Sequence, residues 1–488
     1  MGGVALNEWT RSVVKEDEIT RHLESGKDFI DDALVERLLQ DNSQPEPKQI
    51  RDILDRSRAL QRLEPDETAA LLNVKDQDLW QEIFSAAREV RNHVYGPRIV
   101  TFAPLYCSNL CVNSCLYCAF RRENSVEKRR TLTIEEVRKE TEALVSVGHK
   151  RLIVVYGEHP ASDVDYMAET IRTIYNTKVG NGEIRRVNIN GAPLEIADYK
   201  ILKEIGIGTY QVFQETYHHG MYKKVHPRGV KAHYQWRLYA QHRAQEAGID
   251  DVAIGALFGL YDWRFEVMGL LYHTIALEKA FDGVGPHTIS FPRLEPAANT
   301  PLSVNSPYKV TDGDFKKVIA VIRLSVPYTG MIVTARESAE IRRAAINLGC
   351  TQTDASTRIG IGAYSESHGE QEAERQQFLL GDTRSLDELI RELAEMGYIT
   401  SFCTADYRCG RTGHSFMSIA KKGKIHNLCI PNAILTFKEY LLDYGSEETR
   451  RIGEKLIEQH LNTVAETMRP SVRERLQAIE HGARDLMF

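Results

Sequence analysis

Long apolar stretches are missing from this sequence, and so are the usual signals for export. No apolar run approaches the roughly 18–20 residues that a helix needs to cross a bilayer. Residues 1–15 are mixed and polar, without the basic and apolar segments of a secretory signal. Leu6 stands where N-myristoylation would need Ser or Thr. We therefore expect a cytoplasmic protein that neither spans a membrane nor is anchored to one.

A surplus of one charge is also missing. The 488 residues include 62 Lys+Arg and 68 Asp+Glu, which gives a formal net charge of −6. This balance argues against a protein that coats nucleic acid and against an anionic membrane partner. The apolar fraction of 42% permits a sizeable core, and the length fits one large barrel with additional segments.

Cysteine is present in a clustered pattern. Seven of the eight cysteines fall into two groups, one before residue 120 and one after residue 400. The groups are Cys107, Cys111, Cys115 and Cys118, then Cys403, Cys409 and Cys429. In a reducing cytosol such grouping favours metal binding over disulfides.

The hydrophobic pattern changes along the chain and predicts an α/β fold. Residues 1–95 are polar and helical in pattern, and short β-branched runs then alternate with amphipathic helical stretches. The expected strands are residues 99–105, 152–156, 186–190, 209–214, 252–258, 288–292, 331–334 and 351–354. Eight strands in this alternation predict a TIM-type (β/α)8 barrel, with an open doubly wound sheet as the competing interpretation.

Three regions follow from this pattern. We expect an N-terminal helical region at 1–95, a barrel at 96–367 and a helical C-terminal region at 368–488. Thr133 and Glu136 form a capping box that should open one barrel helix, and residues 234–247 should form another. The C-terminal region carries the second cysteine group.

The first cysteine group has the spacing C-x3-C-x2-C, formed by Cys111, Cys115 and Cys118. Three thiolates on a short loop can hold three irons of a 4Fe–4S cluster and leave the fourth iron open to a chelating substrate such as S-adenosylmethionine (SAM). The loop follows the first expected strand, at the barrel end where such folds perform chemistry. A structural zinc site, with Cys107 as fourth ligand, is the alternative. Tyr117 would place an aromatic ring beside the site.

The cysteine motif resembles the signature of the radical SAM superfamily. The second expected strand ends in Tyr156-Gly157-Glu158, which resembles the Gly-Gly-Glu motif of that family with Tyr156 in place of the first glycine. The resemblance implies that Gly157 and Glu158 hold the SAM amino group. It also implies a contribution to SAM binding from Gly255 and Ala256, in the segment 254–260.

Further segments narrow the resemblance to the tyrosine lyase branch of that superfamily. They are residues 208–217, 254–260, 285–290 and 431–433. Within the branch the chain most resembles the FeFe-hydrogenase maturase tyrosine lyases, whereas thiazole-pathway tyrosine lyases lack a cluster-binding C-terminal region. The likeness runs from about residue 60 to the C-terminus.

This resemblance implies an activity and its partners. A 5′-deoxyadenosyl radical from SAM would abstract hydrogen from the amino group of tyrosine, and cleavage of the Cα–Cβ bond would release p-cresol and dehydroglycine (2-iminoacetate). The maturases then convert dehydroglycine to carbon monoxide and cyanide at a second cluster. The implied partners are an electron donor such as ferredoxin or flavodoxin and other hydrogenase maturation proteins.

Polar residues at the expected strand ends are candidates for contact with the substrate. An amino acid needs a cation for its carboxylate, and Arg336 and Arg293 end or follow expected strands. Arg336 is the stronger candidate. Gln214 and Glu215 end the fourth strand and are candidate polar contacts. Without the resemblance, a surface ion pair or a loop anchor would explain each of them.

The second cysteine group departs from the maturase pattern C-x2-C-x22-C. Cys403 and Cys429 are in place, but Asp406 occupies the middle position. Three alternatives remain open: Asp406 binds iron through oxygen, Cys409 supplies the third thiolate, or the second cluster is absent. His287 precedes the sixth strand and is a candidate ligand for an extra iron beside this site.

Other classes of function also remain open. The chain could be a tyrosine lyase that stops at dehydroglycine for another pathway, as in thiazole synthesis, or a lyase for another aromatic amino acid. A non-catalytic iron–sulfur scaffold would not need Glu158 or the strand-end arginines. A zinc-stabilised barrel would be colourless, whereas a cluster protein is brown.

Overall fold

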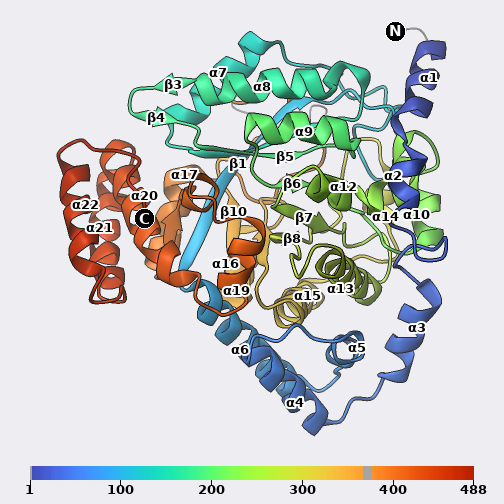
Figure 1. Ribbon diagram of the computed structural model, residues 1–488, viewed down its shortest axis with the longest axis horizontal. Coiled ribbons are helices and arrows are strands. Elements are labelled where there is room, and N and C mark those ends of the chain that lie inside the picture. Colours follow the sequence, from blue (N-terminus) through green and yellow to red (C-terminus); the bar gives the residue numbers. More distant parts are fainter. Residues whose placement is uncertain (1–2, 366–375) are drawn as a thin grey trace.

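The computed structural model describes residues 3–365 and 376–488. Within these residues, nine parallel strands form one sheet in the order β10-β9-β8-β7-β6-β5-β2-β1-β11, and a further pairing of β10 with β1 closes eight of them into a barrel (Figure 1). The barrel strands are β1 (Arg98–Ser108), β2 (Arg151–Tyr156), β5 (Arg186–Asn190), β6 (Tyr210–Gln211), β7 (Val252–Gly255), β8 (Thr288–Ser290), β9 (Gly330–Val333) and β10 (Gln352–Asp354). The predicted (β/α)8 barrel is confirmed, and the open-sheet alternative is wrong.

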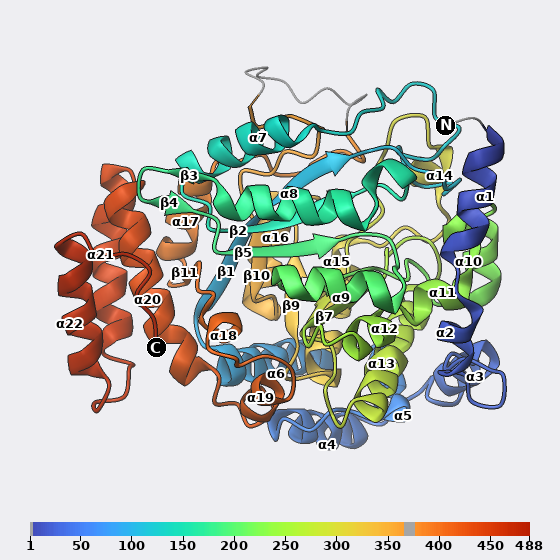
Figure 2. The same ribbon diagram turned by 45° about the horizontal axis from the view of Figure 1, so that its top comes forward.

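Helices follow the strands and cover the outside of the barrel (Figure 2). They are α7 (Ile134–Ser146), α8 (Val164–Asn176), α9 (Ile196–Ile205), α10 (His219–Val225), α11 (Tyr234–Leu238), α12 (Ala240–Glu246), α13 (Trp263–Ala280), α14 (Pro301–Asn305), α15 (Asp312–Ser325) and α16 (Ala339–Leu348). The capping box of Thr133 and Glu136 opens α7 as predicted. The single helix expected at 234–247 is divided into α11 and α12, which meet at Tyr239. A small antiparallel pair, β3 (Lys178–Val179) and β4 (Gly182–Glu183), was not predicted.

The N-terminal region is helical as expected. It contains α1 (Gly3–Val13), α2 (Glu16–Thr20), α3 (Asp32–Asp41), α4 (Pro47–Arg58), α5 (Pro65–Leu72) and α6 (Gln77–Tyr95). Buried apolar side chains of α4, α5 and α6 belong to the same core as the barrel strands and α15. The helix α6 ends at Tyr95 and β1 begins at Arg98, and the domain boundary expected after residue 95 stays a prediction.

The C-terminal region contains one unexpected strand. Its elements are α17 (Leu386–Glu395), β11 (Ile399–Ser401), α18 (Ala405–Arg408), α19 (Gly413–Ala420), α20 (His426–Asp443), α21 (Glu447–Leu461) and α22 (Arg469–Glu480). The strand β11 pairs with Arg98, Ile99 and Val100, which begin β1. Because β11 adds to the beginning of β1, the residues after β11 lie at the N-terminal end of the barrel. The boundary expected between 367 and 368 lies outside the described residues.

In the described part of the chain, no helix combines the length and apolarity that crossing a membrane requires. Figure 1 shows α20, α21 and α22 grouped on one side of the barrel and α1 on the other.

Candidate active site and a second cysteine cavity

A cavity of about 1020 Å³, including space open to solvent, lies at the carboxyl ends of the barrel strands. It is lined by residues that follow five of these strands: Cys111 after β1, Glu158 after β2, Asn190 at the end of β5, Glu215 after β6 and Arg336 after β9. This is the barrel end at which TIM-type enzymes place their active sites. The cavity is therefore the candidate active site.

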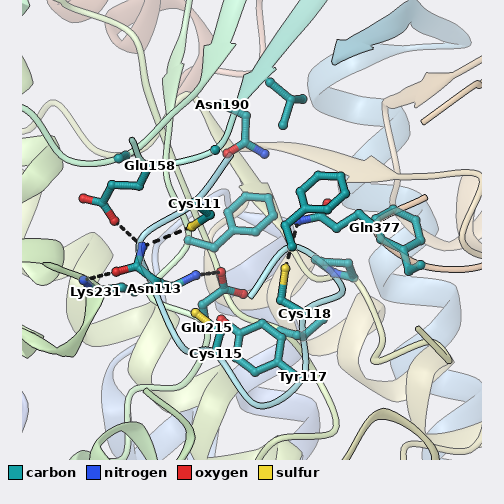
Figure 3. A pocket seen from close by; sticks show the side chains of 18 of the residues that line it. Cys111, Asn113, Cys115, Tyr117, Cys118, Glu158, Asn190, Glu215, Lys231 and Gln377 are labelled. Atoms are coloured by element: carbon teal, nitrogen blue, oxygen red, sulfur yellow. Dashed lines mark hydrogen bonds and ion pairs between the residues drawn. The ribbon is translucent and has the colours of Figure 1, made fainter. Parts of the chain in front are cut away.

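Three cysteines line this cavity together, as predicted: Cys111, Cys115 and Cys118. Figure 3 shows all three on the loop that follows β1. In the described residues, no group of three or more His, Cys, Asp or Glu side chains is arranged to hold a single metal ion. In a 4Fe–4S cluster each thiolate binds a different iron, so the sulfurs need not converge on one point. The proposed fourth zinc ligand, Cys107, is fully buried within β1.

Asn113 ties the cysteine loop to the end of β2. Its amide nitrogen donates to Glu158 Oε2 at 2.6 Å and to Cys111 Sγ at 3.5 Å (Figure 3). Its amide oxygen accepts from the backbone of Lys231 at 2.9 Å. Sequence reasoning missed this residue, although it lies inside the cysteine motif. Its position between Cys111 and Cys115 was the available signal.

Glu158 presents one carboxylate oxygen without a partner. The side chain is buried, and Oε1 has no hydrogen-bond partner in the described structure, whereas Oε2 accepts from Asn113. Burial raises the pKa of Glu158. Gly157 lets this segment approach the cysteine loop, because an added Cβ would lie 2.2 Å from the carbonyl oxygen of Leu110. A free acceptor beside the three cysteines suits an ammonium group.

Tyr117 lines the cavity and is fixed by a histidine. Its hydroxyl lies 2.9 Å from His226 Nε2. The other ring nitrogen, Nδ1, lies 3.0 Å from the carbonyl oxygen of Tyr222 and must donate to it. Burial lowers the pKa of His226 well below its usual value, so the ring is neutral and Nε2 accepts from the Tyr117 hydroxyl. The aromatic ring expected beside the site is thus held in one orientation.

The two polar residues after β6 face different surroundings. Glu215 lines the cavity and pairs with Lys231 at 2.6 Å and Arg237 at 3.5 Å. Burial alone would raise the pKa of Glu215, but Lys231 and Arg237 lower it below its usual value. Its φ of 71° is a strained conformation for a residue with a side chain, as is common at functional sites. Gln214 is buried outside the lining and donates to the carbonyl oxygen of Tyr234.

The two arginines at the strand ends also differ in their surroundings. Arg336 lines the cavity, and its guanidinium lies 3.2 Å from the ring centroid of Phe378. It forms no ion pair within the described residues. Arg293 is bound by the carboxylates of Glu337 and Asp312. We therefore take Arg336 as the cation that is free to bind a ligand, and Arg293 as an anchor for its loop.

An inner cavity of about 620 Å³ continues from the first into the barrel. The two cavities share Arg336, Asn190 and Phe213. About half of the residues that line this inner cavity are apolar, among them Phe102, Ile153, Ile332 and Phe378, and the others include the polar side chains of Gln211, Ser290 and Asp354. Gly255 and Ala256, expected to contact SAM, line neither cavity as described, and Leu257 lines the first one instead. Gly255 is needed for packing, because an added Cβ would lie 2.5 Å from the ring of Phe213.

Gln377 is another residue that the sequence did not identify. Its amide nitrogen lies 3.6 Å from Cys118 Sγ, and its amide oxygen accepts from the Tyr106 hydroxyl at 3.1 Å. Figure 3 shows it beside Cys118. No motif surrounds Gln377, and it is far from the cysteines in sequence, so no local signal was available.

Four of the five remaining predicted ligands gather at the other end of the barrel. Cys403, Asp406, Cys429 and His287 line one cavity of about 480 Å³. Cys403 follows β11, Cys429 lies in the first turn of α20 and His287 directly precedes β8. His287 therefore lies beside the second cysteine group and does not line the first cavity; its role as an iron ligand stays a prediction.

Within this second cavity Asp406, rather than Cys409, lies with the two cysteines. Cys409 is exposed and its sulfur lies 3.9 Å from that of Met487. Asp406 forms an ion pair with Arg411 at 3.3 Å. Burial raises the pKa of Cys403 to about 11 and that of Cys429 to about 12. Both thiols are therefore neutral at pH 7 unless a metal displaces the proton.

Comparison with known proteins agrees with this geometry. Residues 105–267 match the Radical SAM superfamily, and residues 290–399 match the Biotin and Thiamin Synthesis associated domain. The 2-iminoacetate synthase of Salmonella typhimurium is 31% identical over 339 residues, which cover 69% of this chain and 85% of the relative. The crystal structure of HydG, a maturase of the [FeFe]-hydrogenase, is 50% identical with a TM-score of 0.91, over 94% of this chain and 100% of that one. The chain therefore belongs to the family of radical SAM enzymes that contains the 2-iminoacetate synthase and HydG.

A second solved maturase extends the likeness. HydG from Carboxydothermus hydrogenoformans is 37% identical, with a TM-score of 0.79 over 94% of this chain and 99% of that one. The expected resemblance to radical SAM lyases of this branch is confirmed. The likeness includes the C-terminal region as well as the barrel.

Membership of the radical SAM superfamily implies a 4Fe–4S cluster and SAM as cofactors. The residues of the first cavity fit both groups. Three cysteines that share one cavity provide the thiolates. The unpartnered Oε1 of Glu158 provides a buried anionic acceptor for the SAM amino group.

Proposed function

We propose that this radical SAM enzyme cleaves the Cα–Cβ bond of L-tyrosine and releases p-cresol and dehydroglycine for assembly of the [FeFe]-hydrogenase cofactor. The likeness over nearly the whole chain to a HydG maturase at 50% identity carries the proposal. The likeness to a 2-iminoacetate synthase supports the same product, because dehydroglycine and 2-iminoacetate are one compound. When bound, the cluster and SAM supply one electron and a carbon radical that abstracts hydrogen.

In this proposal a small number of residues in the first cavity bind the cluster, SAM and tyrosine. Cys111, Cys115 and Cys118 hold the cluster, and Glu158 accepts hydrogen bonds from the SAM amino group. Arg336 binds the tyrosine carboxylate, since it is a partly buried cation without an ion pair in the described residues. The inner cavity, whose walls include Phe102, Ile153 and Ile332, then receives the phenol ring. A non-catalytic scaffold would have no use for an unpaired arginine and an unpaired glutamate oxygen at this place.

The pairing of Arg336 with the carboxylate can be tested by replacement. Arg336→Ala should raise the KM for tyrosine about thirtyfold or more, because a partly desolvated charge pair contributes about 2–5 kcal/mol. SAM cleavage should continue and should become uncoupled from p-cresol formation. Arg336→Lys should restore part of the coupling. A normal tyrosine KM in Arg336→Ala would contradict the assignment.

For the second cavity we propose that Asp406 takes the place of the third cysteine beside Cys403 and Cys429. Its carboxylate faces the same cavity, whereas Cys409 is exposed. A carboxylate is a harder iron ligand than a thiolate, and Arg411 competes for it, so this site should be more labile than the first. The products of such a site would be carbon monoxide and cyanide, made from dehydroglycine.

A tyrosine lyase that stops at dehydroglycine is the second candidate function, and Asp406 is the observation that favours it. Carbon monoxide decides between the two. Protein reconstituted with iron and sulfide should be given SAM, tyrosine and a reductant, with deoxyhaemoglobin present as a trap. Carbon monoxide together with p-cresol supports the complete maturase reaction, and p-cresol alone supports the lyase that stops early.

A further inference from the structure

We propose that the second cavity contains a binding site for a small carboxylate anion, formed by the guanidinium groups of Arg98 and Arg151. The inference rests on the proposed function for the identity of the natural ligand. That ligand is dehydroglycine, the fragment of tyrosine that keeps the carboxylate, whereas p-cresol carries no charge. Sequence reasoning singled out neither arginine.

Both arginines line the second cavity together with Cys403 and Cys429. Arg98 is the first residue of β1 and Arg151 the first residue of β2, so both stand at the amino ends of barrel strands. Side chains alternate between the two faces of a strand, and Arg98 and Val100 accordingly line the cavity from the same face of β1. The two cations are thus placed by the barrel strands rather than by a loop.

Arg98 lacks a counter-ion. Within the described residues its side chain forms neither an ion pair nor a hydrogen bond, and its Nε is buried without a partner. Its guanidinium carbon lies 5.5 Å from the ring centroid of Tyr95. Burial lowers the pKa of Arg98, but Cys429, Tyr95 and Asp406 together raise it above its usual value, so the side chain stays charged. A buried charge of this kind costs free energy unless a ligand completes it.

Arg151 is only 7% exposed and is also incompletely paired. One guanidinium nitrogen donates to the carbonyl oxygen of Cys403, which fixes the group beside the second cysteine group. Its Nε is buried without a partner, and the side chain forms no ion pair in the part of the chain that the structure describes. A guanidinium has five N–H donors, so several remain for a ligand.

The surroundings add positive charge rather than cancel it. Arg186 begins β5 and is level with Arg151 in the sheet, and its guanidinium carbon lies 3.1 Å from the ring centroid of Tyr407, which lines the cavity. Among the described residues that line the cavity, Asp406 is the one carboxylate, and Arg411 pairs with it at 3.3 Å. The cavity therefore has a surplus of cations.

The cysteines do not remove this surplus. Burial keeps the pKa of Cys403 at about 11 and that of Cys429 at about 12, so both thiols are neutral at pH 7. A metal that displaced their protons would bring positive charge of its own.

The type of cation indicates the type of anion. A guanidinium donates two parallel hydrogen bonds to the two oxygens of a carboxylate, which a spherical ion cannot accept. The cavity of about 480 Å³ has room for an acid as small as dehydroglycine. An acid bound by Arg98 and Arg151 is held beside Cys403 and Cys429, the residues to which we assign the second reaction.

Equilibrium dialysis of radiolabelled glycolate tests the site, because glycolate is a stable acid of the same size as dehydroglycine. The reconstituted protein should contain SAM and tyrosine but no reductant, so that the first cavity is filled and no turnover occurs. The variants are Arg98→Gln and Arg98→Lys. The matched control is Arg336→Gln, which removes the same charge from the first cavity, where glycolate then also lacks its cation. Thermal unfolding shows whether each variant is folded.

We expect the wild type and Arg336→Gln to bind about one glycolate per chain with the same affinity. Arg98→Gln should bind it about ten- to a hundredfold more weakly, because a charge-assisted pair is lost. Arg98→Lys should be intermediate, since it keeps the charge but loses the planar fork. Chloride should compete poorly with glycolate.

Several results would overturn the site. They are a wild type that binds no glycolate, an Arg98→Gln protein that binds it normally, and chloride that competes as well as a carboxylate does, which would indicate a site for any anion. If Arg98→Gln does not fold, Arg98→Lys decides, and a wild-type affinity in that variant would contradict the bidentate contact.

Binding of glycolate needs no turnover, which keeps this test separate from the proposed function. Glycolate binding by a protein that forms 5′-deoxyadenosine but no p-cresol would remove tyrosine as the substrate and leave the carboxylate site intact. Formation of p-cresol by a protein that binds no glycolate would support the lyase and remove the site.

Discussion

Glu158 follows β2 and Arg336 follows β9, and both side chains line the same cavity. One offers an acceptor oxygen without a partner and the other a cation without an ion pair in the described residues. Leaving such groups unpaired costs stability in a folded protein, and they are retained where a ligand completes them. At the scale of residues, the cavity is therefore preorganised for two zwitterionic ligands, SAM and an amino acid.

Replacement of Glu158 by Gln tests the first of these contacts. The amide keeps the size of the side chain but removes the negative charge. Hydrogen bonds to charged groups contribute about 1.5–3 kcal/mol, so the affinity for SAM should fall about ten- to a hundredfold. Equilibrium dialysis of SAM against anaerobically reconstituted protein measures this. Glu340→Gln, an exposed position on α16, is the matched control, and equal affinities in the two variants would exclude Glu158 as the acceptor.

At the scale of elements, α10 is attached to the N-terminal region by ion pairs. His219, the first residue of α10, lies 2.8 Å from Asp32 and 3.2 Å from Asp28. Burial alone would lower the pKa of His219, but the two aspartates raise it to about 9. This contribution to stability is fully present below about pH 6.5 and is lost as the pH rises through 9.

The pH dependence of this attachment can be measured by hydrogen exchange. Amides of residues 28–32 should be more protected at pH 6 than at pH 10, after correction for intrinsic rates. The difference should be about 1 kcal/mol, because the His219 side chain is 38% exposed and solvent screens the pairs. His219→Gln should remove the difference. Protection that is independent of pH in the wild type would show that the pairs contribute nothing.

A replacement of Asp406, which lies in α18, tests whether the second cavity holds a cluster. Asp406→Cys places a third thiolate in the cavity that Cys403 and Cys429 already line. Thiolates are the preferred ligands of iron–sulfur clusters, so the variant should retain about four more irons per chain after chelator treatment than the wild type. Iron analysis and EPR spectroscopy measure this. Retention of only about four irons per chain in both proteins would indicate that the cavity does not hold a cluster.

The elements also show how far the sequence alone could go. All eight barrel strands were predicted, since each is a β-branched run bounded by helical patterns. The residues that follow β1 and β2 could also be assigned to one end of the barrel, because parallel barrel strands all end on the same side. The strand β11 was missed, because a three-residue strand has no periodicity and its pairing with β1 spans about 300 residues. Asn113, Lys231 and Gln377 were missed for a similar reason: their contacts depend on loops that meet only after folding.

At the scale of the whole molecule, the barrel separates two cysteine sites. One lies at the carboxyl ends of the strands and the other at the amino ends, where β11 extends the sheet. The two cavities share no lining residue. This separation predicts that damage to the C-terminal site leaves the first reaction intact.

The most direct measurement is p-cresol and carbon monoxide from one anaerobic reaction with SAM, tyrosine and a reductant, for the wild type, Cys115→Ala and Cys403→Ala. We predict that the wild type makes p-cresol, that Cys115→Ala makes neither product, and that Cys403→Ala makes p-cresol at close to the wild-type rate without carbon monoxide. No p-cresol from a wild-type protein that still forms 5′-deoxyadenosine would contradict tyrosine as the substrate. Equal loss of p-cresol in a folded Cys403→Ala protein would contradict the separation of the two sites.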